Sequence, residues 1–493
     1  MARRKPLDDV PEVFRSTTKT SAMVSGALKK RAIRKIGPRL YTTNTEDAPE
    51  VVIRRNLWQT VSLLFPNTVV AHRTALEAMP TPDGVVYLSG AYTRKMKLPG
   101  LTIQQVKGPG PLPGDARFIE GLWFASRGRA FLENLKPARI RSSARRTIER
   151  ADLEKRLEGI LRAAGVDALN DLRDQAATVA PDLEAEEELA TLNDIIGTLV
   201  GTRSASLKDA SALARSLGHP YDPARLEIFE KLFSELSGNE AVSRPSECSP
   251  ADCASNLAFF DAYFSNYIEG TEFELDEAKE IVFQNKIPAR RPADAHDILG
   301  TFRVLTDRKA MKMSATEFAD ADEFIRTLKL RHATIMEARL DENPGEFKTE
   351  ANFAGGTAFV APEIVDGTLR RGYEIFRALP DPFSRAAFMM FLVTEVHPFA
   401  DGNGRTARVM MNAELESENE THILIPTVYR DDYMGALRAL SRDRYAKPLV
   451  QMLDYAQRFT SLIDFSDYDR ALGLLTQSNA FEHHRAMRLL LPE

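Results

Sequence analysis

The sequence predicts a mainly α-helical protein whose helical part is preceded by an α+β region. Short runs with strand character occur between turn signals in the first third, and after residue 122 apolar residues recur mostly at helical spacing. The chain has 493 residues, which is enough for about three domains. Charged residues make up 27% and hydrophobic residues 43%, which are values of a globular protein and exclude a fibrous or wholly disordered chain.

Three regions follow from these patterns: an α+β module at 1–150, an acidic helical connector at 151–240 and a helical domain at 241–493, which holds the candidate catalytic motif described below. Residues 84–88, 94–98 and 101–105 read as strands, the last two joined at Pro99 and Gly100. From residue 122 to 150 the pattern becomes helical, with interleaved arginines. Residues 237–251 gather Ser, Pro, Gly and Asn, which is typical of a linker.

The amino-terminal segment is strongly basic. Residues 1–39 hold 11 Lys or Arg and three acidic residues, although the net charge of the whole chain is −5. Residues 25–44 (SGALKKRAIRKIGPRLYTTN), followed by 69–78 (VVAHRTALEA), are similar to winged-helix regulators of the AbiEi antitoxin type. The resemblance implies a DNA-binding helix-turn-helix followed by a small α+β unit. A protein-docking module and a solvated surface are the alternatives.

Charge reverses in the connector, where residues 151–200 hold 12 acidic and four basic side chains. For the cluster 184–188 (EAEEE) we favour a solvated helix face over a binding tail. Only two cysteines occur, Cys248 and Cys253, which fits a reducing compartment. The longest apolar run, 386–393, is far shorter than the roughly 18–20 residues that span a bilayer. We therefore expect a cytoplasmic protein without a membrane partner.

Residues 397–408 (HPFADGNGRTAR) lie between two predicted helices, 383–396 and 406–416. Asp381 is the expected N-cap of the first helix and Pro382 its first residue. In the loop, Gly402 and Gly404 permit positive φ and close approach of a ligand, so that successive N–H groups can bind phosphate. The Asn403 amide can add a donor.

The flanking residues complete a site for a nucleotide. Arg405 and Arg408 are three apart on the second helix, so both guanidiniums can point toward the same end of a polyphosphate. Asp401 offers a hard oxygen ligand for Mg²⁺, and His397 has a side-chain pKa suited to a general base. Together they predict Mg²⁺-dependent transfer from a nucleoside triphosphate.

The segment resembles the signature HxFx(D/E)GNGRxxR of Fic-domain proteins, which mostly transfer AMP from ATP to a hydroxyl of a target protein. The resemblance covers residues 220–470 and implies a Fic-type helical domain. It implies the following roles: His397 as general base, Phe399 as core anchor, Asp401 on Mg²⁺, Gly402, Asn403 and Gly404 around the α- and β-phosphates, Arg405 on the β-phosphate and Arg408 on the γ-phosphate. The acidic residue at 401 favours nucleotidyl transfer over the kinase-like and phosphocholine variants.

Upstream, residues 265–270 (SNYIEG) look like the family's inhibitory motif (S/T)xxxE(G/N) on a predicted helix, 257–269. Ser265 and Glu269 share a helix face, and a Glu269 carboxylate paired with Arg408 would occupy the cation that the γ-phosphate needs. The alternative is an ordinary helix end capped by Gly270. In some relatives the same glutamate supports removal of AMP.

Residues 346–362 form a predicted hairpin that resembles the family's flap, with Gly355, Gly356 and Thr357 as target-binding residues. A purely structural hairpin is the alternative. His296, His332 and His422 lie outside the motif and are interpreted as structural or surface residues.

These observations predict a protein adenylyltransferase that modifies a Ser, Thr or Tyr hydroxyl of a target protein and is restrained by Glu269. The two alternatives are a DNA-binding regulator of toxin–antitoxin type with a restrained Fic core, and a de-AMPylase that uses Glu269. A homodimer is a further possible assembly, because relatives often cover the active site in dimers.

Overall fold

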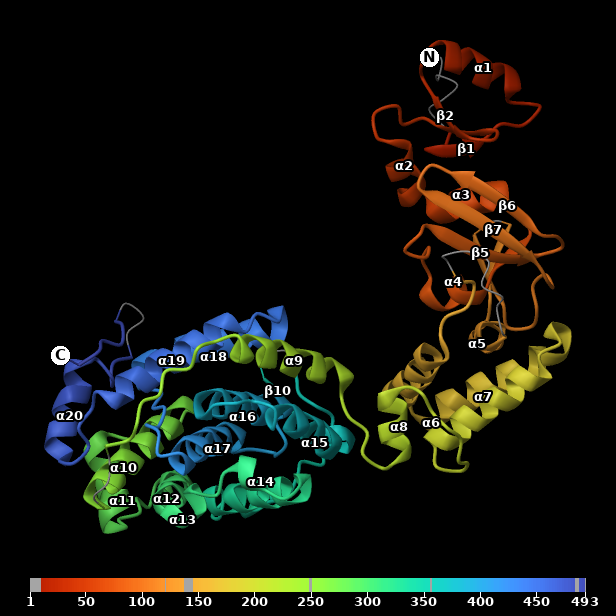
Figure 1. Ribbon diagram of the computed structural model, residues 1–493. Helices are drawn as coiled ribbons and strands as arrows, with labels where there is room; N and C mark the ends of the chain where they lie inside the picture. Colours follow the sequence, from red (N-terminus) through yellow and green to blue (C-terminus); the bar gives the residue numbers. More distant parts are fainter. Residues whose placement is uncertain are drawn as a thin grey trace. The chain divides into compact units, whose positions relative to one another are not determined.

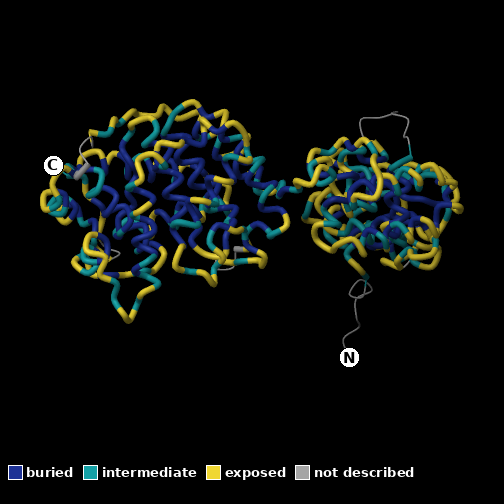
Figure 2. The backbone as a smooth tube through the Cα atoms, turned by 90° about the horizontal axis from the view of Figure 1, so that it is seen from below, coloured by how far each residue is buried: buried dark blue, intermediate teal, exposed yellow. Residues whose placement is uncertain are grey.

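The computed structural model describes residues 10–119, 121–136, 145–247, 251–354, 357–483 and 487–492. The chain divides into two compact units, residues 1–217 and 218–493 (Figure 1). Each unit has its own buried interior with exposed residues outside it (Figure 2). The predicted boundaries at 150 and 240 differ from this division, because residues 151–217 share a core with the segment before them and residues 218–240 pack on the second unit.

The first unit begins with a small antiparallel sheet in the order β1-β3-β2, made of β1 (Val13–Arg15), β2 (Arg34–Gly37) and β3 (Leu40–Thr42). Helix α1 (Ser21–Lys29) connects β1 to β2. Within the described part, residues 25–44 therefore hold the end of one helix and a β-hairpin rather than two successive helices. Arg3, Arg4 and Lys5 lie outside the described residues, and DNA binding by this region stays a prediction.

A six-stranded mixed sheet follows, in the order β6-β7-β5-β4-β9-β8. Its strands are β4 (Thr68–Val70), β5 (Val85–Gly90), β6 (Arg94–Leu98), β7 (Leu101–Lys107), β8 (Ala116–Ile119) and β9 (Leu122–Phe124), and helices α2 (Pro49–Arg55), α3 (Leu57–Leu64) and α4 (His72–Glu77) accompany it. The three predicted strands are confirmed. Gly100 turns β6 into β7 with a φ of +68°, a conformation that glycine adopts without strain.

The described part of this unit is completed by helices α5 (Arg127–Leu135), α6 (Arg150–Leu183), α7 (Glu186–Leu199) and α8 (Ala210–Ser216). Phe131 and Leu132 of α5 share one apolar core with α6 and α7, so residues 151–217 of the predicted connector are part of the first unit. Gly165 interrupts α6 with a φ of 77°. The side chains of Glu184, Glu186 and Glu187 are exposed, in line with a solvated face.

The second unit is built around two adjacent helices, α16 (Pro382–Val396) and α17 (Asn403–Ser417) (Figure 1). Asp381 accepts a hydrogen bond from the Ser384 N–H at 2.8 Å, which confirms the predicted N-cap. The surrounding helices are α9 (Pro223–Ser237), α10 (Ala251–Ile268), α11 (Leu275–Gln284), α12 (Pro292–Thr306), α13 (Arg308–Met311), α14 (Ala321–Ile335), α15 (Val365–Phe376), α18 (Arg430–Asp443), α19 (Lys447–Ser461) and α20 (Tyr468–Gln477). The two pairing strands are β10 (Phe353–Ala354) and β11 (Thr357–Ala358).

Nearly every residue of α16 is buried, because its apolar side chains face neighbours on all sides. The predicted mainly α fold with an α+β amino-terminal region is thus confirmed.

Among helices of the described residues, none has the length and apolar content to cross a bilayer. Cys253 is disulfide-bonded, which differs from the free thiols that a reducing compartment would favour.

Candidate active site

The loop between α16 and α17 is closed by the side chain of Asn403. Its Oδ1 accepts a hydrogen bond from the Phe399 N–H at 2.8 Å, and its Nδ2 donates to the Phe399 carbonyl at 2.9 Å. Helix α17 begins at Asn403, three residues before the predicted start at Thr406, with Gly402 as N-cap at a φ of 73°. The Asn403 amide thus shapes the loop, and its predicted donation to phosphate stays a prediction.

Phe399 anchors the loop as predicted, and the residue that holds it is His332 of α14. The two rings stack with centroids 3.6 Å apart and planes 2° from parallel. His332 Nδ1 accepts from the Gly345 N–H at 2.9 Å, so its proton resides on Nε2, which lies 3.0 Å from the Asp401 carbonyl and donates to it. Burial lowers the pKa of His332 to about 4, and the neutral ring keeps this pattern at neutral pH.

His397 is held as a neutral imidazole. Its residue caps α16 in the left-handed region, with a φ of 53°. Nδ1 lies 3.2 Å from the Thr394 carbonyl, which can only accept, so the neutral ring carries its proton on Nδ1 and keeps the lone pair on Nε2. Burial lowers the pKa of His397 to about 4. Nε2 is therefore the atom that can take a proton at neutral pH.

Arg408 is bound to the helix that carries the predicted inhibitory motif. Its Nη2 donates to Glu269 Oε1 at 2.6 Å and to the Ser265 carbonyl at 2.9 Å, while its Nε donates to Ser265 Oγ at 2.9 Å. The Arg408 side chain is only 3% exposed. Burial alone would lower its pKa, but the Glu269 carboxylate and Tyr433 raise it. Arg408 is thus a buried cation whose charge Glu269 balances.

The Glu269 carboxylate also lies directly on the amino-terminal turn of α17. A Cβ placed on Gly404 would be 2.1 Å from Glu269 Oε1 and 3.1 Å from Arg408 Nη1. Only glycine leaves room for this approach. A carboxylate therefore occupies the place where free N–H groups and the helix dipole favour an anion.

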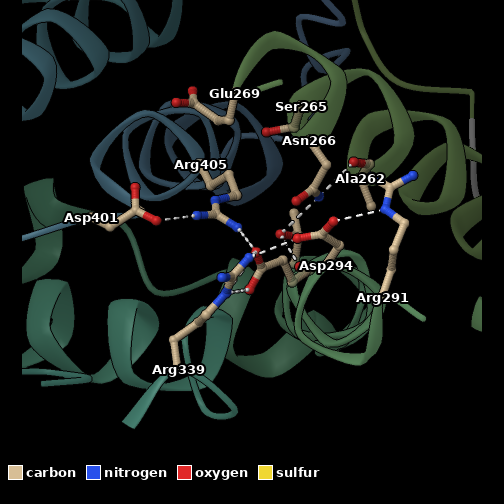
Figure 3. A network of polar contacts seen from close by, with 12 residues as sticks. Ala262, Ser265, Asn266, Glu269, Arg291, Asp294, Arg339, Asp401 and Arg405 are labelled. Atoms are coloured by element: carbon tan, nitrogen blue, oxygen red, sulfur yellow. Dashed lines mark hydrogen bonds and ion pairs between the residues drawn. The ribbon is translucent and has the colours of Figure 1, made fainter. Parts of the chain in front are cut away.

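Arg405 takes part in a chain of alternating charges (Figure 3). Its Nη1 lies 2.8 Å from Asp297 Oδ2, and its Nη2 lies 3.2 Å from Asp401 Oδ2. Asp297 also accepts from Arg339 Nη2 at 2.7 Å, and Arg339 in turn contacts Asp294 at 2.9 Å. Side-chain hydrogen bonds to Asp297 raise the pKa of Arg339. The buried Asp297 carboxylate thus links two guanidiniums.

The two arginines of the motif consequently have different partners, although the sequence predicted that both point toward one end of a polyphosphate. Spacing on the helix places Arg405 and Arg408 on one side, but the partners come from different helices, α12 for Arg405 and α10 for Arg408. Asp401 lies at the solvent edge, with its side chain 50% exposed. In the described ranges, no three His, Cys, Asp or Glu side chains gather as a metal site.

The predicted flap is a short antiparallel pair in which Phe353 lies opposite Ala358. Gly355 and Gly356 lie outside the described residues, and Thr357 begins β11. The flap is fastened to the loop, because Asn352 Nδ2 donates to the Phe399 carbonyl at 3.0 Å.

Sequence reasoning missed Asp297 and Arg339, and it assigned His332 only a structural or surface place. It also missed Lys348, whose N–H donates to the Pro398 carbonyl at 2.9 Å, and Phe359, whose ring stacks on the His397 imidazole. Asp297 lies in α12, yet nothing in its local spacing marks it as a partner of Arg405. His332 lies 65 or more residues before the loop it supports. At this separation no periodic pattern in the sequence indicates that His332 contacts the loop.

Comparison with known proteins agrees with this geometry. The profile of the Fic/DOC family matches residues 325–415. "Protein adenylyltransferase Fic" of Nematostella vectensis is 27% identical over 255 residues, covering 49% of this chain and 54% of the relative. A "Fido domain-containing protein" of Dictyostelium discoideum is 31% identical over 103 residues, covering 20% of this chain and 72% of the relative.

A Fic-domain signaling protein of Bacteroides thetaiotaomicron has a solved structure that matches with a TM-score of 0.39 and 16% identity, covering 51% of this chain and 97% of that one. The chain spans about half the length of the Nematostella relative. The family profile falls on α14 to α17, the helices that build the site, and the Dictyostelium relative is matched over most of its length. The chain belongs to the Fic/DOC family.

Proposed function

We propose that the chain is a protein adenylyltransferase, which transfers AMP from ATP to a Ser, Thr or Tyr hydroxyl of a target protein and is restrained by Glu269. The observation that carries the proposal is His397, a neutral ring with its proton on Nδ1 and its lone pair on Nε2, at the start of the loop that leads into the amino terminus of α17. The relative from Nematostella bears the name of this activity, which supports the same conclusion.

The chemistry needs one proton acceptor and one anion site. The acceptor hydroxyl gives its proton to Nε2 of His397 as its oxygen attacks the α-phosphorus of ATP. The bond from the α-phosphorus to the bridging oxygen breaks, and the electron pair leaves with pyrophosphate. Backbone N–H groups at the start of α17, together with Arg408 once it is free of Glu269, stabilise the charge on the phosphates. The products are AMP esterified to the target and pyrophosphate.

Asp401 is the residue that would hold Mg²⁺. Its carboxylate is half exposed at the edge of the loop, and one protein carboxylate suits an ion that takes its other oxygens from phosphates and water. Bound there, Mg²⁺ would neutralise negative charge on the polyphosphate. Arg405 contacts the Asp401 carboxylate at 3.2 Å and is itself held by Asp297 at 2.8 Å. Asp297 thus helps to orient the Asp401 carboxylate by holding Arg405 in place.

Restraint follows from competition for one cation. Arg408 is bound by Glu269 and by both oxygens of Ser265, and Glu269 lies against Gly404. A γ-phosphate that needs Arg408 must displace a charge-assisted hydrogen bond, which contributes about 1.5–3 kcal/mol. ATP binding in the productive orientation is therefore weak until Glu269 moves.

The proposal is tested with α-³²P-ATP and cell lysate, using the wild-type chain, Glu269→Gly and His397→Ala. We expect strong labelling of protein with Glu269→Gly and little with the wild type or with His397→Ala. Absence of label with Glu269→Gly, while γ-³²P-ATP labels protein instead, would mean that the chain transfers phosphate and not AMP.

Removal of AMP is the second candidate, favoured by one observation. The Glu269 carboxylate lies beside Gly404 at the amino terminus of α17, where it could orient a water toward an AMP-modified side chain. Label transferred by Glu269→Gly should then disappear on addition of wild-type chain. If it persists, Glu269 acts in restraint alone.

A further inference from the structure

The flap arm, residues 348–354 and 357–359, is tied to the catalytic loop at several points. The Lys348 N–H donates to the Pro398 carbonyl at 2.9 Å, and Asn352 Nδ2 donates to the Phe399 carbonyl at 3.0 Å. Lys348 Nζ donates to Asn352 Oδ1 at 2.6 Å, and the Phe359 N–H donates to the Asn352 carbonyl at 3.2 Å. These contacts fix the place of Phe359 relative to the loop.

Phe359 lies flat on the imidazole of His397. The ring centroids are 3.8 Å apart and the planes are 6° from parallel. The Thr394 carbonyl binds Nδ1 of the same ring at 3.2 Å. The hydrogen bond to Thr394 therefore fixes the tautomer of His397, and the Phe359 ring covers one face of the imidazole. A substrate hydroxyl can then reach the lone pair only at the Nε2 edge of the ring.

We propose that Phe359 is a positioning residue for His397, so that the flap orients and shields the general base in addition to any target it holds. This inference rests on the proposed role of His397 as base. A hydrogen bond to Nδ1 alone allows the imidazole to tilt about that bond. The parallel Phe359 ring, at van der Waals distance, prevents this tilt. A general base that is already oriented toward its proton donor reacts faster than one that has to reorient first.

The end of β11 is fixed from a second side. Arg225 of α9 donates to the Ala358 carbonyl, and its guanidinium also contacts Glu395 of α16, two residues before His397. Ala358 immediately precedes Phe359. Strand β11, which would receive a target segment, is thus followed directly by Phe359, whose ring covers His397. A target that binds to β11 would therefore also affect the orientation of the His397 imidazole.

Several charged groups face His397 from the elements around it. Lys348 of the flap arm acts to lower its pKa, whereas Glu269 of the inhibitory motif and Asp401 of the loop act to raise it, and burial is the largest effect. The Lys348 ammonium lies 5.9 Å from the centre of the Phe359 ring. Removing the Phe359 ring would therefore hydrate His397 without removing any of these charges.

The first test measures the exposure of His397 directly, so it does not depend on the activity. Full-length chains are treated with diethyl pyrocarbonate at about pH 7, where the neutral imidazole is the reactive form, and modification of His397 is followed by peptide mass spectrometry. We expect Phe359→Ala to react about fivefold or more faster than the wild type. Phe359→Tyr keeps the ring and should match the wild type. Phe353→Ala removes an exposed flap ring that is 69% accessible and should also match it.

The second test separates orientation from binding. In a Glu269→Gly background, Phe359→Ala should lower kcat by about 10- to 100-fold with little change in KM for ATP, and Phe359→Tyr should restore kcat. Phe359→Leu replaces Phe359→Ala should the latter not fold. Equal diethyl pyrocarbonate rates in Phe359→Ala and the wild type overturn the proposal. If Glu269→Gly transfers no AMP at all, the proposed function fails, while the modification rates still decide the role of Phe359.

Discussion

Glu269, which directly follows α10, and Arg408, in the second turn of α17, form a charge-assisted hydrogen bond of 2.6 Å. The Glu269 carboxylate lies between Arg408 and the amino-terminal turn of α17, and a Cβ on Gly404 would collide with it. If Arg408 binds the γ-phosphate as proposed, the nucleotide and the chain's own glutamate compete for one guanidinium. The proposed restraint of the site rests on this competition.

Removal of the Glu269 carboxylate should strengthen ATP binding. We expect Glu269→Gly to lower the Kd for ATP about tenfold or more, since one charge-assisted hydrogen bond no longer has to be displaced. Isothermal titration calorimetry measures the change. Glu272→Gly, which removes an exposed carboxylate three residues further on, is the matched control and should leave Kd unchanged. Equal Kd values for all three chains would contradict the competition.

Loss of Asp297 should destabilise the second unit. This carboxylate is 1% exposed and balances both Arg405 and Arg339, so Asp297→Asn leaves two guanidiniums without a full counter-charge. Breaking such a buried pair costs about 3–5 kcal/mol. Asp294→Asn, a partly exposed member of the same chain of charges, should cost clearly less. Differential scanning calorimetry distinguishes them, and equal effects of the two changes would show that burial of Asp297 does not govern stability.

The sequence predicted those features that depend on neighbouring residues, such as helix starts and turns. Asp381 and Pro382 begin α16 where expected, Gly100 makes the predicted turn, and His397 directly follows α16 as the sequence predicted. The partners of the motif could not be predicted in the same way. Asp297 meets Arg405 across 108 positions of the chain, and Phe359 meets His397 through the path of a loop. Such contacts depend on tertiary packing and leave no period in the sequence. The Ser265–Glu269 contact with Arg408 was anticipated only because a family resemblance supplied it.

His332 should support catalysis without touching a substrate. His332→Ala removes the ring under Phe399 and two hydrogen bonds, so the loop 397–402 loses the groups that fix its path. In the Glu269→Gly background we expect AMP labelling to fall about 10-fold or more. His296→Ala alters a half-buried histidine of α12 and serves as control. Unchanged labelling by His332→Ala would show that Asn403 alone is sufficient to close the loop.

His422 should make stability depend on pH in the alkaline range. It is buried with Nδ1 3.7 Å from Asp261 and Nε2 3.4 Å from Glu416; burial lowers its pKa, but the two carboxylates raise it to about 9. Because the folded state holds the proton more tightly than the unfolded state, this stabilisation is complete below about pH 6.5 and is lost as pH rises through about 9.

The contribution amounts to about 3 kcal/mol by linkage. Calorimetric unfolding of the wild type and of His422→Gln at about pH 6 and about pH 10 measures it. The difference in stability between the two chains should be large at the lower pH and small at the higher one. A difference that does not change with pH would mean that His422 is neutral in the folded protein.

Transfer of AMP by His397 is the central claim, and mass spectrometry of the modified protein tests it most directly. Lysate incubated with ATP and Glu269→Gly should yield peptides in which a Ser, Thr or Tyr hydroxyl carries one adenylyl group. The double variant Glu269→Gly/His397→Ala should yield none, although it still binds ATP. Phosphorylated peptides in place of adenylylated ones, or adenylylation that persists without His397, would contradict the account.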